Sequence, residues 1–69
     1  MVTGIPEQIR DAIASLQAVE SQVKRLLKSA RERRIFFGLT YDYVDEDIAQ
    51  VLGRLRYMQL VLEHKAAEH

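Results

Sequence analysis

The sequence contains no cysteine and no tryptophan, and its 69 residues include one proline and three glycines. A chain without cysteine forms neither a disulfide framework nor a thiolate metal site. Ten basic residues balance ten acidic ones, and zero net charge argues against attraction of the whole molecule to nucleic acid or anionic lipid. No apolar run approaches the roughly 18–20 residues of a membrane span. We therefore expect no membrane partner and a cytoplasmic location.

The residues that are present have the composition of a folded protein. Hydrophobic residues make up 48% of the chain and charged residues 29%, whereas disordered segments are poor in apolar side chains. We expect a single domain over residues 1–69. Domains below about 70–80 residues rarely bury enough apolar surface to be stable alone, so the length predicts a partner.

Apolar residues recur at alternating steps of three and four through the first half of the chain, with charged residues opposite. This pattern predicts an amphipathic helix over about 6–37. Pro6 suits the first turn, and Gly38 is expected to stop the helix because a left-handed residue costs glycine little. The apolar stripe comprises Ile9, Ala12, Leu16, Val19, Val23, Leu26 and Ala30.

A second helix is predicted over about 41–66, with Thr40 as its cap and the acidic residues of 42–47 at its positive end. The turn between the helices covers about 38–40, and so short a connection makes the helices antiparallel. The alternative, a strand over 35–44, has only a second copy of itself to pair with. The second stripe comprises Tyr41, Val44, Ile48, Val51, Leu55, Met58 and Leu62. We expect the seam between the helices to contain Leu16, Val23, Leu26, Val51, Leu55 and Met58.

The second helix carries further apolar residues on nearly the opposite side from its main stripe, whereas the far side of the first helix is polar. A helix that is apolar on two faces is normally buried on two faces, although isolated exposed apolar residues are common on soluble proteins. We expect this second face to contact a copy of the chain or another protein. The expected interface comprises Gly53, Tyr57, Leu60, Val61 and His64.

Four of the five aromatic residues lie in the segment 35–43. One interpretation has Phe37, Leu39 and Tyr41 closing the end of the hairpin. In the other, Phe36 and Tyr43 point outward and dock into a partner, because aromatic residues dominate binding hot spots.

Six basic residues fall within 24–34, against one acidic residue. One interpretation is charge complementarity across the turn, in which Arg33 and Arg34 pair with the acidic start of the second helix. The other is an electrostatic footprint for RNA or DNA on the outer side of the first helix. The residues expected to contact nucleic acid in that case are Lys24, Arg25, Lys28 and Arg31.

Residues with catalytic chemistry are scarce. The two histidines, His64 and His69, do not have the i, i+3 or i+4 spacing that places two metal ligands on one side of a helix. The acidic residues of 42–47 lack the alternating ligands and glycine of a calcium loop. Neither a phosphate-binding glycine loop nor a nucleophilic triad is present. We expect no enzyme activity, no metal and no cofactor.

The sequence thus predicts an all-α protein, an antiparallel two-helix hairpin that self-associates into a four-helix bundle. A dimer is the first expectation and a tetramer the second, because two-fold pairing is the commonest arrangement of identical chains. The expected function is that of a non-enzymatic protein–protein interaction module or regulatory adaptor. The alternative is a dimeric RNA- or DNA-binding protein that uses the basic side of the first helix.

Overall fold

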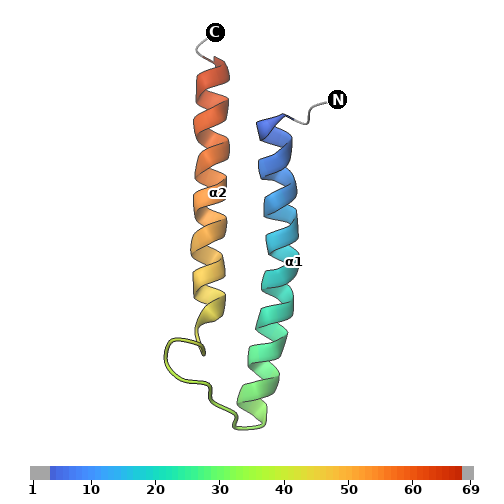
Figure 1. Cartoon of the computed structure of the whole chain (residues 1–69), viewed down its shortest axis with the longest axis vertical. Helices are drawn as coiled ribbons and strands as arrows, with labels where there is room; N and C mark the ends of the chain where they lie inside the picture. The colour runs from blue at the N-terminus through green and yellow to red at the C-terminus, as the bar shows by residue number, and fades with distance from the viewer. Residues whose placement is uncertain (1–3, 68–69) are drawn as a thin grey trace.

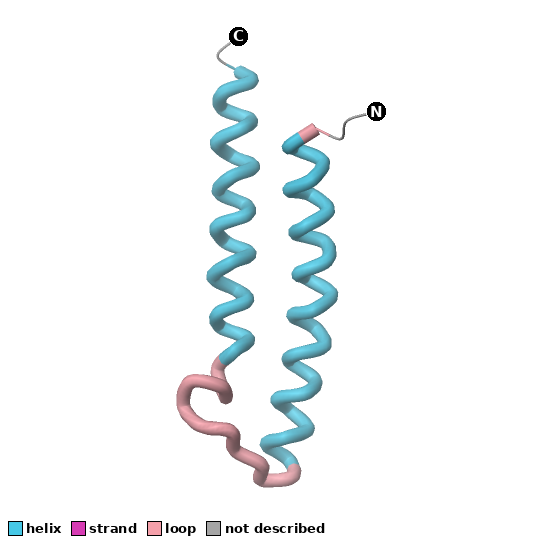
Figure 2. The backbone as a smooth tube through the Cα atoms, viewed as in Figure 1, coloured by secondary structure: helices cyan, strands magenta, loops and turns pink. Residues whose placement is uncertain are grey.

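The computed structural model describes residues 4–67, with side chains to residue 65. Two helices, α1 (Ile5–Glu32) and α2 (Val44–Ala67), lie side by side and antiparallel, joined by a loop over residues 33–43 (Figures 1 and 2). The molecule is long and thin, with extents of 55 × 24 × 13 Å. The predicted all-helical hairpin is confirmed. In the described range, segment 35–44 contains no strand.

The C-terminal end of α1 is closed by backbone hydrogen bonds that reverse the chain. The N–H of Ile35 donates to the carbonyl of Ala30 at 2.8 Å, and the N–H of Arg34 donates to the carbonyl of Arg31 at 3.1 Å. This pair of bonds is a Schellman motif, which requires a left-handed residue just after the helix. Arg34 supplies it with φ 58°. The helix therefore ends at Glu32 rather than near residue 37, and Arg34 takes the stop role expected for Gly38.

The loop that follows is folded back on itself. The carboxylate of Asp42 accepts hydrogen bonds from the backbone N–H groups of Phe37 at 3.1 Å and Gly38 at 3.3 Å. The carbonyl of Gly38 accepts from the N–H groups of Tyr41 at 3.0 Å and Asp42 at 2.9 Å. Gly38 has φ 120°, a conformation that residues with a side chain rarely adopt. Because these bonds hold segment 38–42 as a turn, α2 begins at Val44 instead of near residue 41.

The buried part of the seam between the helices is apolar. Ile9, Ile13 and Leu52 are buried there, and Leu27 and Ala30 are buried toward the loop. Partly buried side chains pack around the central three residues. They are Leu16, Ile48, Leu55 and Leu62.

Part of the expected seam lies outside it. Leu26, Val51 and Met58 are 58%, 45% and 47% exposed, while their neighbours Leu27 and Leu52 are buried. The reason is geometric. The apolar stripe on each helix is wider than the strip that one partner helix covers, so one edge of it stays in solvent.

Half-buried polar residues interrupt the seam on both helices. Asp45 and Gln59 lie seven residues before and after Leu52, and therefore on the same side of the helix. Both are half-buried, and the Oδ1 atom of Asp45 is buried without a hydrogen-bond partner. On α1, Glu20 is half-buried as well. The hairpin consequently has a small core.

Candidate interaction surfaces

Large apolar side chains remain exposed on three surfaces of the hairpin. The first, here the lateral face, follows one side of the seam. The second, the outer face, lies on α2 and contains the five residues of the interface expected from the sequence; two of them, Tyr57 and Val61, also line a hollow shared with α1. The third is the aromatic loop, residues 35–43. The lateral face comprises Ile5, Ala12, Val19, Leu26, Val51 and Met58.

The lateral face is built by a seven-residue repeat. Ile5, Ala12, Val19 and Leu26 follow one another at this interval along α1 and, since seven residues make nearly two turns, they form one row. Each lies four residues before a member of the buried or half-buried row that forms the seam. The face is therefore continuous with the core.

Both helices contribute to this face on the same side of the molecule. At the open end of the hairpin, one apolar hollow joins residues of α1 to residues of α2. It is lined by Ile5, Ile9, Tyr57, Met58, Val61 and Leu62. Ile5 and Met58 belong to the lateral face, so the rows on the two helices meet.

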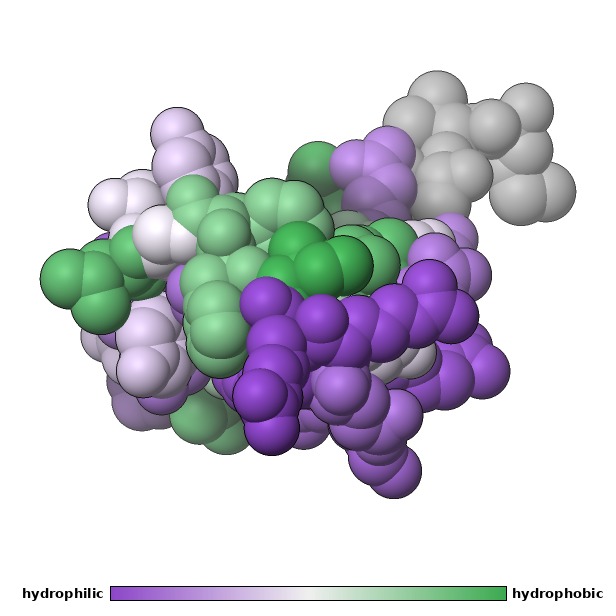
Figure 3. All heavy atoms as spheres, turned by 90° about the horizontal axis from the view of Figure 1, so that it is seen from below, coloured by the Kyte–Doolittle hydropathy of each residue, from purple (hydrophilic) through white to green (hydrophobic). Residues whose placement is uncertain are grey.

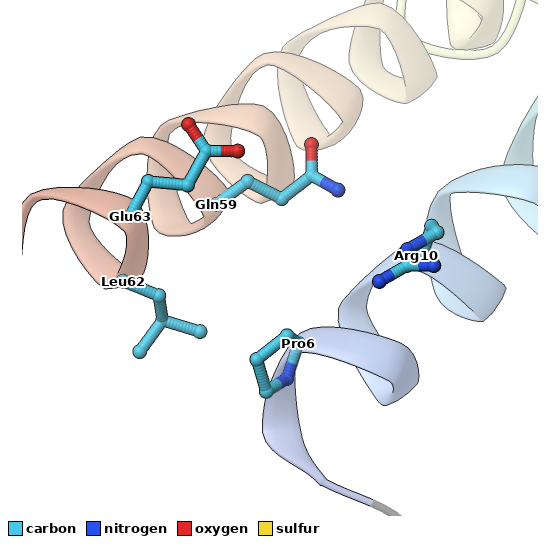
Figure 4. Close-up of a pocket in the computed structure, with 5 residues that line it drawn as sticks. All are labelled: Pro6, Arg10, Gln59, Leu62 and Glu63. Atoms are coloured by element: carbon cyan, nitrogen blue, oxygen red, sulfur yellow. The ribbon is translucent and has the colours of Figure 1, made fainter. Parts of the chain in front are cut away.

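The other side of the seam is polar at the same end. A shallow hollow there is lined by Pro6 and Arg10 from α1 and by Gln59, Leu62 and Glu63 from α2. Figure 4 shows the Gln59 side chain extending toward α1, with the carboxylate of Glu63 turned away from Arg10. At this end of the hairpin, the charged and amide side chains beside the seam thus lie on one side, and the apolar hollow lies on the other.

The outer face lies on α2 as the sequence pattern placed it. Tyr57 and Leu60 are 67% and 61% exposed, Gly53 and His64 are exposed, and Val61 is half-buried against the α1 end. A Cβ atom added at Gly53 would meet nothing within 4 Å. Within the hairpin, there is therefore open space above Gly53.

The aromatic loop is exposed at the end of the molecule opposite both termini (Figure 1). Phe36 is 72% and Tyr43 50% exposed. Phe37, Leu39 and Tyr41 are also exposed, so they do not close the end of the hairpin. Figure 3 looks at this end and shows hydrophobic side chains gathered beside hydrophilic ones.

The basic residues of α1 are accessible. Lys24, Arg25, Lys28 and Arg31 are all exposed, and the Arg31 guanidinium donates to the carbonyl oxygen of Asp42 at 3.4 Å. Within residues 4–65, no ion pair joins Arg33 or Arg34 to the acidic start of α2, so the expected charge pairing across the turn is not present.

The described part of the chain contains neither a metal-binding cluster nor a membrane-spanning helix. There, no group of three or more His, Cys, Asp or Glu residues is arranged to hold a metal ion. Neither described helix is long and apolar enough to cross a membrane. His69 lies outside the described residues.

Comparison with protein-family models, with curated proteins and with solved structures found no match for this chain. The surfaces above are therefore interpreted from their own geometry. The sequence pattern had placed Leu26, Val51 and Met58 in the seam instead of on an open face. A signal for this face was present, because each helix has two adjacent rows of apolar residues, and one partner helix covers only one of them.

Proposed function

We propose that this protein is a non-enzymatic protein–protein interaction module that acts as a homo-oligomer, with a four-helix bundle dimer as its basic unit. The observation that carries the proposal is the contrast between a small core and extensive apolar exposure. Among the residues whose side chains the structure describes, five apolar ones are buried, namely Ile9, Ile13, Leu27, Ala30 and Leu52.

Association of two hairpins would bury apolar surface that a single hairpin leaves exposed to water. Removing apolar surface from water contributes about 25 cal/mol per Å², and a two-helix seam covers one strip of each helix. Two hairpins packed face to face enclose four such strips around a common core. Gly53, Leu60 and His64 of the outer face remain on the outside of that dimer together with the aromatic loop, where they are available to a further copy or to another protein.

Sedimentation equilibrium at micromolar concentration tests the proposal. We expect a mass of at least twice the 8.0 kDa of the chain. Because a partner stabilises only the folded chain, the melting temperature should also rise with protein concentration. A stable 8.0 kDa monomer whose melting temperature is independent of concentration would contradict the proposal.

A second candidate function is supported by the exposed basic residues of α1. A dimeric RNA- or DNA-binding protein would use Lys24, Arg25, Lys28 and Arg31, none of which contributes to the seam. Binding through several phosphate contacts weakens steeply between about 50 and 200 mM salt, whereas docking through apolar side chains does not. Changing Lys24, Arg25 and Lys28 together to Gln should preserve folding and abolish such binding. Absence of binding by the unchanged chain at about 50 mM salt would exclude this function.

A further inference from the structure

We infer that a second copy of this chain covers the lateral face, with α1 of one copy antiparallel to α1 of the other. This inference rests on the proposed self-association and specifies its contact and orientation. It differs from the interface expected from the sequence, which lies on the outer face of α2.

The size of the lateral face matches what a stable dimer needs. The row from Ile5 to Leu26 runs about 31 Å along α1 at 1.5 Å per residue, and the hairpin is 24 Å across. The side of the hairpin that carries the lateral face is therefore roughly 700 Å² in outline, comparable to the approximately 800 Å² that each partner contributes to a standard interface. Continuity with the core means that covering this face enlarges the existing core.

The residues that border the row on α1 are uncharged. Gln8, Ser15, Gln22 and Ser29 lie three residues after successive members of the row, and all four are exposed. On the opposite side of the same helix, the seam is bordered by Arg10, Lys24 and Arg31. Like charges brought together by a two-fold axis repel each other, so the uncharged border is the side on which two copies of α1 can approach.

The row is also complementary to itself. Because its members are evenly spaced, a two-fold axis across its midpoint places Ile5 opposite Leu26 of the other copy and Ala12 opposite Val19. The large side chains then meet at the two ends of the contact. The small Ala12 lies near the middle, where it allows the helices to come close.

Two matched substitutions test which face is covered. Val19→Glu places a charge in the lateral face, and Leu60→Glu places the same charge on the outer face. We expect Val19→Glu to halve the dimer mass in sedimentation equilibrium and Leu60→Glu to leave the dimer intact. Circular dichroism checks that each variant is helical, and Val51→Glu replaces Val19→Glu if the latter does not fold. A dimer that is broken by Leu60→Glu and unaffected by Val19→Glu or Val51→Glu would overturn the inference while leaving self-association standing.

The absence of cysteine allows a direct test of orientation. Ser15 lies on the uncharged border, level with the midpoint of the row from Ile5 to Leu26 and so close to the two-fold axis. Two Ser15→Cys chains should therefore be joined efficiently by a short thiol-to-thiol cross-linker. Ser29→Cys lies on the same border but far from the axis, and its two copies should be too distant to react. Equal yields for the two variants, or a higher yield for Ser29→Cys, would overturn the antiparallel arrangement. An unchanged chain that is monomeric in the sedimentation measurement would instead overturn the proposed function itself.

Discussion

Arg34 adopts a backbone conformation that residues with a side chain occupy at a cost. Its φ of 58° lies in the left-handed region, where the Cβ atom approaches the following carbonyl oxygen at a cost of roughly 1–2 kcal/mol. The Schellman hydrogen bonds that end α1 require this conformation. Glycine, which has no Cβ atom, is the usual residue at this position. The hairpin is therefore less stable with arginine at position 34 than it would be with glycine there.

Replacing Arg34 by Gly should raise the free energy of unfolding by about 0.5–1 kcal/mol, because relief of the backbone strain exceeds the added entropy of the unfolded chain. Urea unfolding followed by circular dichroism measures the change. Arg33→Gly is the matched control. Arg33 has φ −92°, an ordinary value, so this substitution should lower stability. If both variants changed stability equally, loss of an arginine charge would be the cause rather than the backbone.

At the scale of the helix, Gly53 is the weak point of α2. Glycine inside a helix is less favourable than alanine by about 0.8–1 kcal/mol. A Cβ atom at this position meets nothing within 4 Å in the hairpin.

We expect Gly53→Ala to raise the free energy of unfolding by about 0.5–1 kcal/mol without changing the oligomer mass. Ala49→Gly, the reverse change at an exposed position on the same helix, should lower stability by a similar amount. Thermal unfolding at matched concentrations measures both. If Gly53→Ala weakened the oligomer, the outer face would be in close contact with a second helix, and the lateral face would not be the sole interface.

The existence and direction of both helices could be predicted from the sequence. Apolar residues that recur at alternating steps of three and four over several turns have no other common explanation. The rotation of each helix about its axis could not. Leu26 and Leu27 are adjacent, as are Val51 and Leu52, and both members of each pair are apolar. The pattern of apolar residues alone does not determine which member of each pair faces the partner helix. In the structure, Leu27 and Leu52 do.

The helix ends and the candidate surfaces were predictable to different degrees. The end of α1 was missed because the left-handed residue is arginine, and the only glycine nearby lies in the loop. The outer face was found from its spacing on α2. The lateral face was not, since its residues have the spacing of a buried stripe and only the packing of α2 on α1 leaves them exposed.

The whole molecule is an elongated plate rather than a sphere. Its radius of gyration is 16.2 Å, against roughly 11 Å for a compact domain of the same length. Its 13 Å thickness is little more than one layer of helices. Such a shape can associate side to side without becoming longer, or end to end through the aromatic loop with a large gain in length.

Small-angle X-ray scattering distinguishes these arrangements. A dimer formed through the lateral face should double the mass while its longest dimension stays near the 55 Å of the single hairpin. A dimer formed through the aromatic loops should be nearly twice as long. The Phe36→Ser variant provides the control, because it should alter an end-to-end dimer and leave a lateral one unchanged.

The short loop over residues 33–43 makes formation of hairpin contacts fast compared with the association of two chains. Closing a loop of about ten residues takes on the order of 10–100 ns, and chains dominated by local contacts fold in microseconds to milliseconds. Encounter of two specific surfaces proceeds at about 10⁵–10⁷ M⁻¹s⁻¹, which at micromolar concentration is roughly 0.1–10 events per second. Formation of local hairpin contacts within one chain is therefore much faster than the encounter of two chains. Refolding of the proposed dimer should therefore be limited by association, with a rate that increases in proportion to the concentration of chains.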